Sequence, residues 1–87
     1  MPGAMKPDEI ERVVLDTVAQ ELRVKPEQVK PASRLVEDLG AGSLNLVEIA
    51  FTLEERLGVQ LPEDVGETVK TVADILRVVR EIAASRR

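Results

Sequence analysis

The aliphatic residues of this chain recur every three to four positions in three segments, and this spacing is the feature that most constrains its fold. It is the period of an α-helix that buries one face. The first segment begins near Pro7 and carries a stripe of aliphatic residues, namely Ile10, Val13, Val14, Val18 and Leu22. We therefore expect an amphipathic helix in this part of the chain.

The second and third segments are bounded by residues that begin and end helices. Ser43 opens the second segment, which runs to about Leu57 and stops at Gly58, a residue that readily adopts the left-handed conformation of a helix end. The third segment starts at a capping box formed by Thr71 and Asp74. These boundaries predict two further helices.

With 87 residues, the chain has room for one compact unit and no second lobe. We predict an all-α fold, a small up-and-down helical bundle of three main helices plus one short helix between Glu63 and Val69. We expect residues 1–6 to form a flexible N-terminus and residues 7–85 to form a single domain.

The stretch between the first two helices, residues 23–42, contains two prolines and two glycines and is expected to be mostly loop. A loop of this length is unusual in so small a domain. Three aliphatic residues are expected to anchor it in the core: Val29, Leu35 and Leu39.

The composition removes most enzyme chemistry. The chain has no Cys, His, Trp or Tyr and one Phe, so it lacks thiol nucleophiles, imidazole bases, Cys/His metal sites and aromatic platforms for single-stranded nucleic acid. We assign no catalytic residue and no metal ligand, and we do not expect an enzyme. No apolar run is long enough to span a membrane and no signal peptide is visible, which makes a cytoplasmic protein the default expectation.

The acidic residues are concentrated in the middle of the chain. The formal net charge of −4 argues against binding to nucleic acid. Between residues 35 and 67, eight acidic residues stand against one basic residue, a local charge of −7. Such a surface attracts positively charged partners. The alternative is a solvated acidic face without a partner.

The second helix has more apolar residues than one buried face needs. A complete core-facing stripe is formed by Leu46, Ile49, Ala50, Leu53 and Leu57. Leu44, Val47 and Phe51 form a second stripe, bordered by acidic residues at positions 48, 54 and 55. We interpret this stripe as a docking surface, on which burial supplies affinity and charge orients the partner. The alternative is a helix buried on two sides.

Ser43 also has two interpretations. A serine at a helix start is a common N-cap, whose hydroxyl accepts a backbone hydrogen bond. However, the residues before it, from Gly40 to Gly42, leave no bulk on the approach, and a phosphate placed there would lie at the positive end of the helix dipole. We therefore favour Ser43 as the site of a covalently attached phosphate group.

The segment LVEDLGAGSL, which ends at Leu44, resembles the acyl carrier protein family around its modified serine. The later pairs Val47–Glu48 and Glu54–Glu55 fit the same pattern, as do the Leu61–Pro62 connector and the start of the last helix. The resemblance covers residues 8–84. It identifies the predicted single domain as an acyl carrier domain.

The resemblance implies a covalent 4'-phosphopantetheine arm that a phosphopantetheinyl transferase moves from coenzyme A onto Ser43. Acyl groups would be held on this arm as thioesters. The implied partners are that transferase and acyl-activating, condensing and acyl-transfer enzymes with basic surfaces, which act on a monomeric carrier. The expected partner-binding residues are Gly42, Leu44, Val47, Glu48, Phe51, Glu54, Glu55 and Glu67. The expected acyl pocket is lined by Leu46, Ile49, Leu53, Gly66 and Val69.

Three positions depart from the family pattern. Gly42 and Asn45 stand where the family often has Asp, and Arg56 stands where an acid is frequent. These changes weaken the attraction for basic partners, which favours a specialised carrier in a fatty acid, lipid or polyketide pathway over the housekeeping one. The alternatives are a non-covalent interaction module and a peptidyl or D-alanyl carrier.

Overall fold

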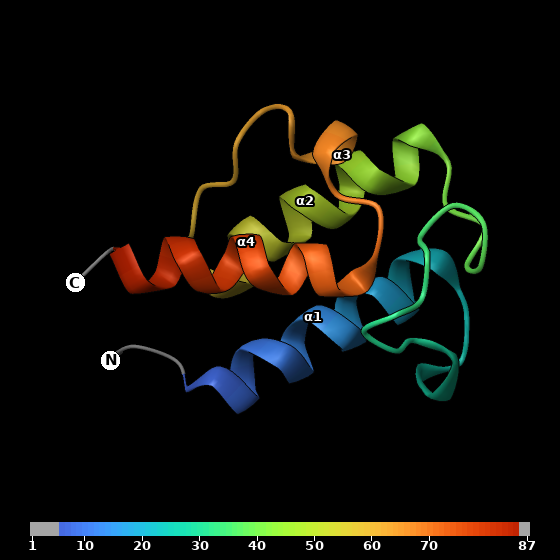
Figure 1. The fold of residues 1–87 in the computed structure, drawn as a ribbon, viewed down its shortest axis with the longest axis horizontal. Helices are drawn as coiled ribbons and strands as arrows, with labels where there is room; N and C mark the ends of the chain where they lie inside the picture. Colours follow the sequence, from blue (N-terminus) through green and yellow to red (C-terminus); the bar gives the residue numbers. More distant parts are fainter. Residues whose placement is uncertain (1–5, 86–87) are drawn as a thin grey trace.

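The computed structural model describes residues 6–85 of the chain. It contains the helices α1 (Pro7–Leu22), α2 (Ser43–Leu57), α3 (Val65–Thr68) and α4 (Val72–Ser85), with a short 3-10 turn at Pro26–Gln28 (Figure 1). No strand occurs in residues 6–85, which confirms the predicted all-α bundle of three main helices and one short one. Apart from Lys6, the predicted flexible N-terminus lies outside the described residues.

The helix ends follow from local chemistry. The Lys6 backbone N–H donates to Glu9 Oε1 at 2.9 Å, which satisfies one free donor at the start of α1. At the start of α4, Asp74 N–H donates to Thr71 Oγ1 at 3.2 Å while Asp74 Oδ2 accepts from Thr71 N–H at 3.1 Å, so the predicted capping box is confirmed. Gly58 ends α2 with a φ of 66°, as its position suggested.

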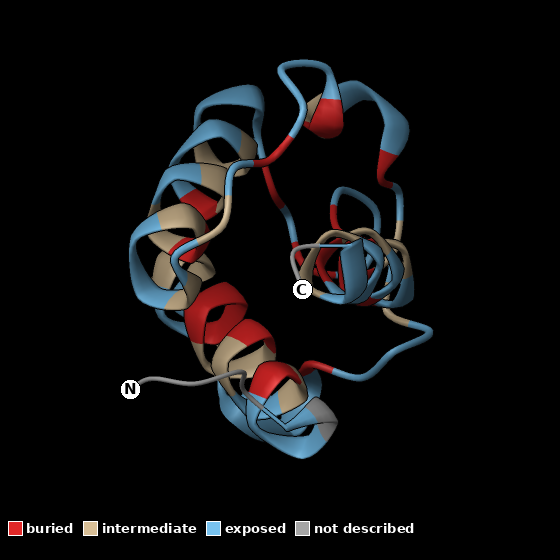
Figure 2. Cartoon of the chain, turned by 90° about the vertical axis from the view of Figure 1, so that its left-hand side faces the viewer, coloured by how far each residue is buried: buried red, intermediate tan, exposed pale blue. Residues whose placement is uncertain are grey.

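The core is formed by aliphatic side chains from every helix. α1 packs against both α2 and α4, and α3 lies against α2. In Figure 2 the buried residues lie on the sides of the helices that face one another. The predicted loop anchors Val29, Leu35 and Leu39 are all buried. Among residues 6–85, Thr17 is the one buried polar residue, and the sequence pattern did not predict its burial.

The long loop between α1 and α2 is held in place by the segment that precedes and begins α4. The Leu35 N–H donates to the Lys70 carbonyl at 2.9 Å, and the Val72 N–H donates to the Ser33 carbonyl at 3.1 Å. These two bonds flank an isolated antiparallel bridge between Arg34 and Thr71. They fix the path of a loop that leads directly to Ser43.

Candidate functional site

Ser43 is the first residue of α2, and its side chain is exposed. The N-cap position is occupied by Gly42, whose backbone N–H donates to Asn45 Oδ1 at 2.9 Å. The interpretation of Ser43 as the N-cap is therefore wrong, because Gly42 and Asn45 form the cap between them. Within residues 6–85 the Ser43 hydroxyl has no hydrogen-bond partner, so it is free to react.

The approach to Ser43 is open, as expected. Gly40 has a φ of 75°, a conformation that favours glycine. Gly42 differs, because its backbone is extended, with a φ of −101°. A Cβ atom at Gly42 would meet Asn45 Oδ1 at 3.6 Å, an ordinary contact, so a side chain is sterically allowed at this position.

The second apolar stripe of α2 points away from the core. The exposed fractions are 70% for Leu44, 48% for Val47 and 63% for Phe51, whereas Ile49 and Leu53 are buried at 3% and 1%. The predicted division of this helix into two faces is confirmed, and the alternative of burial on both sides is wrong. Three large apolar side chains exposed on one helix form a surface that a partner protein can cover.

The acidic residues around this stripe have different environments. Glu48, Glu55 and Glu67 are exposed, as a docking rim requires. Glu54 differs, because it is half-buried and its Oε2 atom accepts a hydrogen bond from the Leu61 backbone N–H at 2.8 Å. Glu54 therefore ties the end of α2 to the following connector, a role that the sequence did not show, and its assignment as a partner-binding residue stays a prediction.

Arg56, one of the three departures from the family pattern, has partners within the bundle. Its guanidinium donates to Asp16 Oδ2 at 3.1 Å and to Thr17 Oγ1 at 2.8 Å, so it cross-links α2 to α1. The sequence did not show this contact. The expectation that Arg56 weakens the attraction for basic partners stays a prediction. Gly42 and Asn45 remain as uncharged positions beside Ser43.

A groove of about 610 Å³ begins at Ser43 and runs between α2 and the segment that contains α3. We call it the serine groove. Its α2 wall includes Val47 and Phe51, and its opposite wall includes Pro62 and Glu67. The remaining lining residues are Leu46, Ala50, Glu54, Gln60, Leu61, Glu63, Val65 and Gly66.

Behind the serine groove lies a small apolar cavity of about 20 Å³. All five residues expected in an acyl pocket line it: Leu46, Ile49, Leu53, Gly66 and Val69. Leu46 and Gly66 also line the groove, so the two spaces meet there. An ideal Cβ atom at Gly66 would lie 3.8 Å from Leu46 Cβ. The cavity has four further lining residues that were not predicted from the sequence: Ala50, Leu61, Val65 and Ile75.

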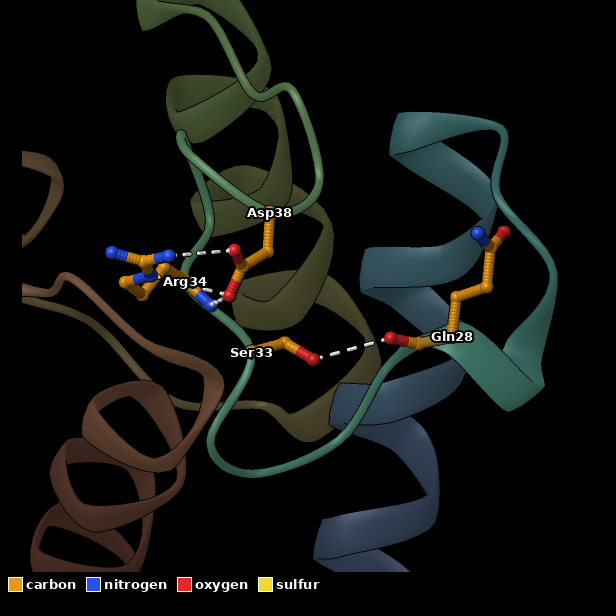
Figure 3. Close-up of polar contacts among 4 residues, drawn as sticks. All are labelled: Gln28, Ser33, Arg34 and Asp38. Carbon is orange, nitrogen blue, oxygen red and sulfur yellow. Dashed lines mark hydrogen bonds and ion pairs between the residues drawn. The ribbon is translucent and has the colours of Figure 1, made fainter.

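The turn before Ser43 is fastened by one ion pair, which we call the Arg34–Asp38 clasp (Figure 3). Asp38 Oδ2 accepts from the Arg34 backbone N–H at 2.8 Å and from Arg34 Nε at 3.3 Å, while Asp38 Oδ1 accepts from Arg34 Nη2 at 3.1 Å. The hydrogen bonds from the Arg34 side chain and then its backbone lower the pKa of Asp38 below its ordinary value of 3.8. The carboxylate is therefore ionised at neutral pH.

No group of three or more acidic side chains in residues 6–85 is placed to hold a metal ion. None of the described helices is long and apolar enough to cross a membrane.

A helical bundle with a free serine at the head of an apolar groove is suited to a carrier domain, which bears its cargo on a covalent arm. The family described as the phosphopantetheine attachment site matches residues 12–79. The chain is 42% identical over 66 residues to the acyl carrier protein of Wolinella succinogenes, covering 76% of this chain and 87% of that protein. It is 41% identical over 81 residues to the acyl carrier protein of Thermosynechococcus vestitus, covering 93% of this chain and all of that protein.

The chain belongs to the acyl carrier protein family, whose prosthetic group is 4'-phosphopantetheine. The residues around Ser43 fit such a group, because the hydroxyl is exposed, the preceding residues add no bulk, and an apolar groove starts beside it. A carrier of this family interacts with the enzymes that modify it.

Proposed function

We propose that this protein carries acyl groups on a 4'-phosphopantetheine arm attached to Ser43 and that it has no catalytic activity of its own. The observation that carries the proposal is the exposed, unpartnered hydroxyl at the head of the serine groove. The chain has no Cys and so has no thiol of its own. The phosphopantetheine group, when bound, supplies the thiol that forms thioesters. Cargo would then be delivered to biosynthetic enzymes.

Attachment of phosphopantetheine to Ser43 requires a separate enzyme. The Ser43 Oγ–phosphorus bond forms as a P–O bond of the pyrophosphate link in coenzyme A breaks, and adenosine 3',5'-bisphosphate is the leaving group. The hydroxyl proton must leave to a base on the transferase, because the chain has no His and no described carboxylate lies within hydrogen-bond distance of Ser43 Oγ. Ser43 is thus the acceptor of the group, and the catalytic residues belong to the partner.

The serine groove and the cavity behind it support an aliphatic cargo. The cavity lining is entirely aliphatic apart from Gly66, so a hydrocarbon chain could enter without leaving a buried polar group unpaired. At about 20 Å³ the cavity is too small for a hydrocarbon chain and would have to widen to admit one. Its α3 wall is a single helical turn that contains a glycine, and this wall is the part best able to move.

The first turn of α2 supports a specialised carrier in a fatty acid, lipid or polyketide pathway. It contains no acidic residue, because position 45 is Asn and the N-cap is Gly42. A transferase that recognises carboxylates at these positions would bind this chain less well. We propose that the natural partner enzymes contact mainly the apolar stripe of α2 and the exposed acidic residues Glu48, Glu55 and Glu67.

The experiment that tests the carrier function measures intact mass after incubation with coenzyme A and a promiscuous phosphopantetheinyl transferase. We expect the chain to gain the mass of one phosphopantetheine group. The mass of a non-covalent interaction module would not change. A chain that stays unmodified with several transferases would contradict the carrier function.

Replacing Gly42 with Asp is expected to increase kcat/KM for modification by a general transferase about two- to fivefold. The new carboxylate adds an acidic contact at the positive end of α2, and the allowed backbone leaves the helix undisturbed. Rates are followed by mass spectrometry at fixed salt. Ala84→Asp, which adds the same charge on α4, is the control, and an unchanged or slower Gly42→Asp rate would show that the glycine is no handicap.

Reversing the charge of Glu48 is expected to slow association with the transferase about 3- to 10-fold at low ionic strength. An exposed rim charge steers encounter and is screened by salt, so the effect should nearly vanish at about 1 M salt, where the screening length is about 3 Å. Stopped-flow association rates of Glu48→Lys test this. Glu81→Lys, an equal charge change on α4, should have little effect, and equal slowing by both variants would refute a local role for Glu48.

A further inference from the structure

Four large apolar side chains are exposed in residues 6–85, and one of them is not on α2. Val36 lies in the turn before Ser43 and is 54% exposed, close to the values for Val47 and Phe51. The cargo pocket does not explain this residue, because Val36 lines neither the serine groove nor the cavity.

Backbone hydrogen bonds hold Val36 beside the approach to Ser43. The Val36 carbonyl accepts from the Gly40 N–H at 3.0 Å, and the neighbouring Leu35 carbonyl accepts from the Ala41 N–H at 2.9 Å. Ala41 is two residues from Ser43, and both Leu35 and Ala41 are buried. The turn is therefore packed against the residues that lead into α2, with Val36 left on the outside.

The Arg34–Asp38 clasp closes this turn from its two ends. The three bonds from Arg34 to the Asp38 carboxylate are joined by a bond from the Asp38 N–H to the Arg34 carbonyl at 2.9 Å. Figure 3 shows the Asp38 carboxylate turned toward Arg34. On the other side, the bond from the Leu35 N–H to the Lys70 carbonyl holds the turn to the segment just before α4. Val36 is thus exposed on a turn that hydrogen bonds hold in position on both sides.

The residue after Val36 is acidic, like the residues that border the apolar stripe of α2. Glu37 is exposed, and none of the ion pairs formed within residues 6–85 involves it. An exposed valine followed by an exposed glutamate occurs again in α2, at Val47 and Glu48. The same partner chemistry, an apolar patch with basic residues at its edge, fits both places.

We infer that the Val36 turn is a second docking element, contacted by the phosphopantetheinyl transferase while it modifies Ser43 and held in position by the Arg34–Asp38 clasp. The inference rests on the proposed carrier function. The transferase is the expected occupant because it must approach the Ser43 hydroxyl itself and so covers the residues on both sides of it. Enzymes that act later receive the cargo at the end of a flexible arm.

The test measures KM and kcat for modification at saturating coenzyme A, together with thermal unfolding midpoints. Val36→Ala is expected to raise KM about 3- to 10-fold with little change in kcat or in the midpoint, because an exposed contact contributes to docking and not to the core. Val78→Ala, the same truncation of a half-buried valine on α4, is the control and should lower the midpoint without raising KM.

A double-mutant cycle tests the role of the clasp. Asp38→Ala, which removes both acceptor oxygens, should raise KM by itself, and adding Val36→Ala should then raise it less than about twofold further, because the turn no longer presents the valine. Asp16→Ala, which breaks an ion pair of the same 3.1 Å length between α1 and α2, should leave KM unchanged. Arg34→Ala retains the backbone N–H bond to Asp38 and should have a smaller effect than Asp38→Ala.

The outcomes separate the inference from the proposed function. An unmodified wild-type chain overturns both. A modified chain in which Val36→Ala leaves KM unchanged overturns the docking element alone. Fully additive effects of Val36→Ala and Asp38→Ala overturn positioning by the clasp.

Discussion

Replacing Ser43 with Ala is expected to abolish the gain of mass when the chain is incubated with coenzyme A and a promiscuous transferase. The Ser43 hydroxyl is the proposed acceptor, and an alanine side chain cannot form the bond to phosphorus. The fold should persist, because this hydroxyl makes no hydrogen bond within residues 6–85 and alanine is favourable in a helix. We expect the unfolding midpoint to change by no more than a few degrees.

Ser33→Ala is the matched control for this experiment. Its hydroxyl donates to the Gln28 carbonyl at 3.1 Å (Figure 3). It also accepts from the Lys30 N–H at 3.0 Å. The variant should lower stability and still take up one group. Continued modification of Ser43→Ala would mean that another residue is the attachment site.

Replacing Phe51 with Ala is expected to reduce transfer to partner enzymes about tenfold while leaving the free energy of unfolding within about 0.5 kcal/mol of the wild type. Phe51 is 63% exposed and lies on the apolar stripe beside the serine groove. Its ring should therefore be buried in the complex and contribute little to the isolated fold. Partner turnover and chemical denaturation, measured on the same preparation, test both parts.

Leu53→Ala provides the opposite case two residues along the same helix. Leu53 is 1% exposed, so truncation leaves a core cavity and should cost about 2–5 kcal/mol of stability. Because Leu53 also lines the cavity, this comparison uses stability and not transfer. If Phe51→Ala unfolds the domain as Leu53→Ala does, the stripe belongs to the core, and the docking surface proposed for α2 is wrong.

The local features of this chain could be predicted because they depend on neighbouring residues. The helical period places Leu53 and Phe51 on different faces of α2 whatever lies around the helix. The start of α4 was predictable because Thr71 and Asp74 form a local capping box, although the Val72 N–H also donates to the Ser33 carbonyl of the distant loop. The break in the helix at Gly58 is equally local.

The candidate site was predicted in part. The resemblance to the family assigned four aliphatic residues and Gly66 to one pocket, and the structure places all five around one cavity. The pattern did not show that Glu54 binds the Leu61 backbone or that Arg56 reaches Asp16 on α1. Both side chains look like free surface charges until their partners are known.

What the sequence by itself determined is therefore the set of helices, their buried faces and the place of Ser43 at the start of α2. The tertiary structure alone decided which charges remain free for a partner, which residues complete the cavity, and how the loop before Ser43 is braced. The physical reason is the range of the interactions. Helical periodicity and capping act over three or four residues, whereas the bond from Leu35 to Lys70 and the one from Arg56 to Asp16 join residues far apart in the chain.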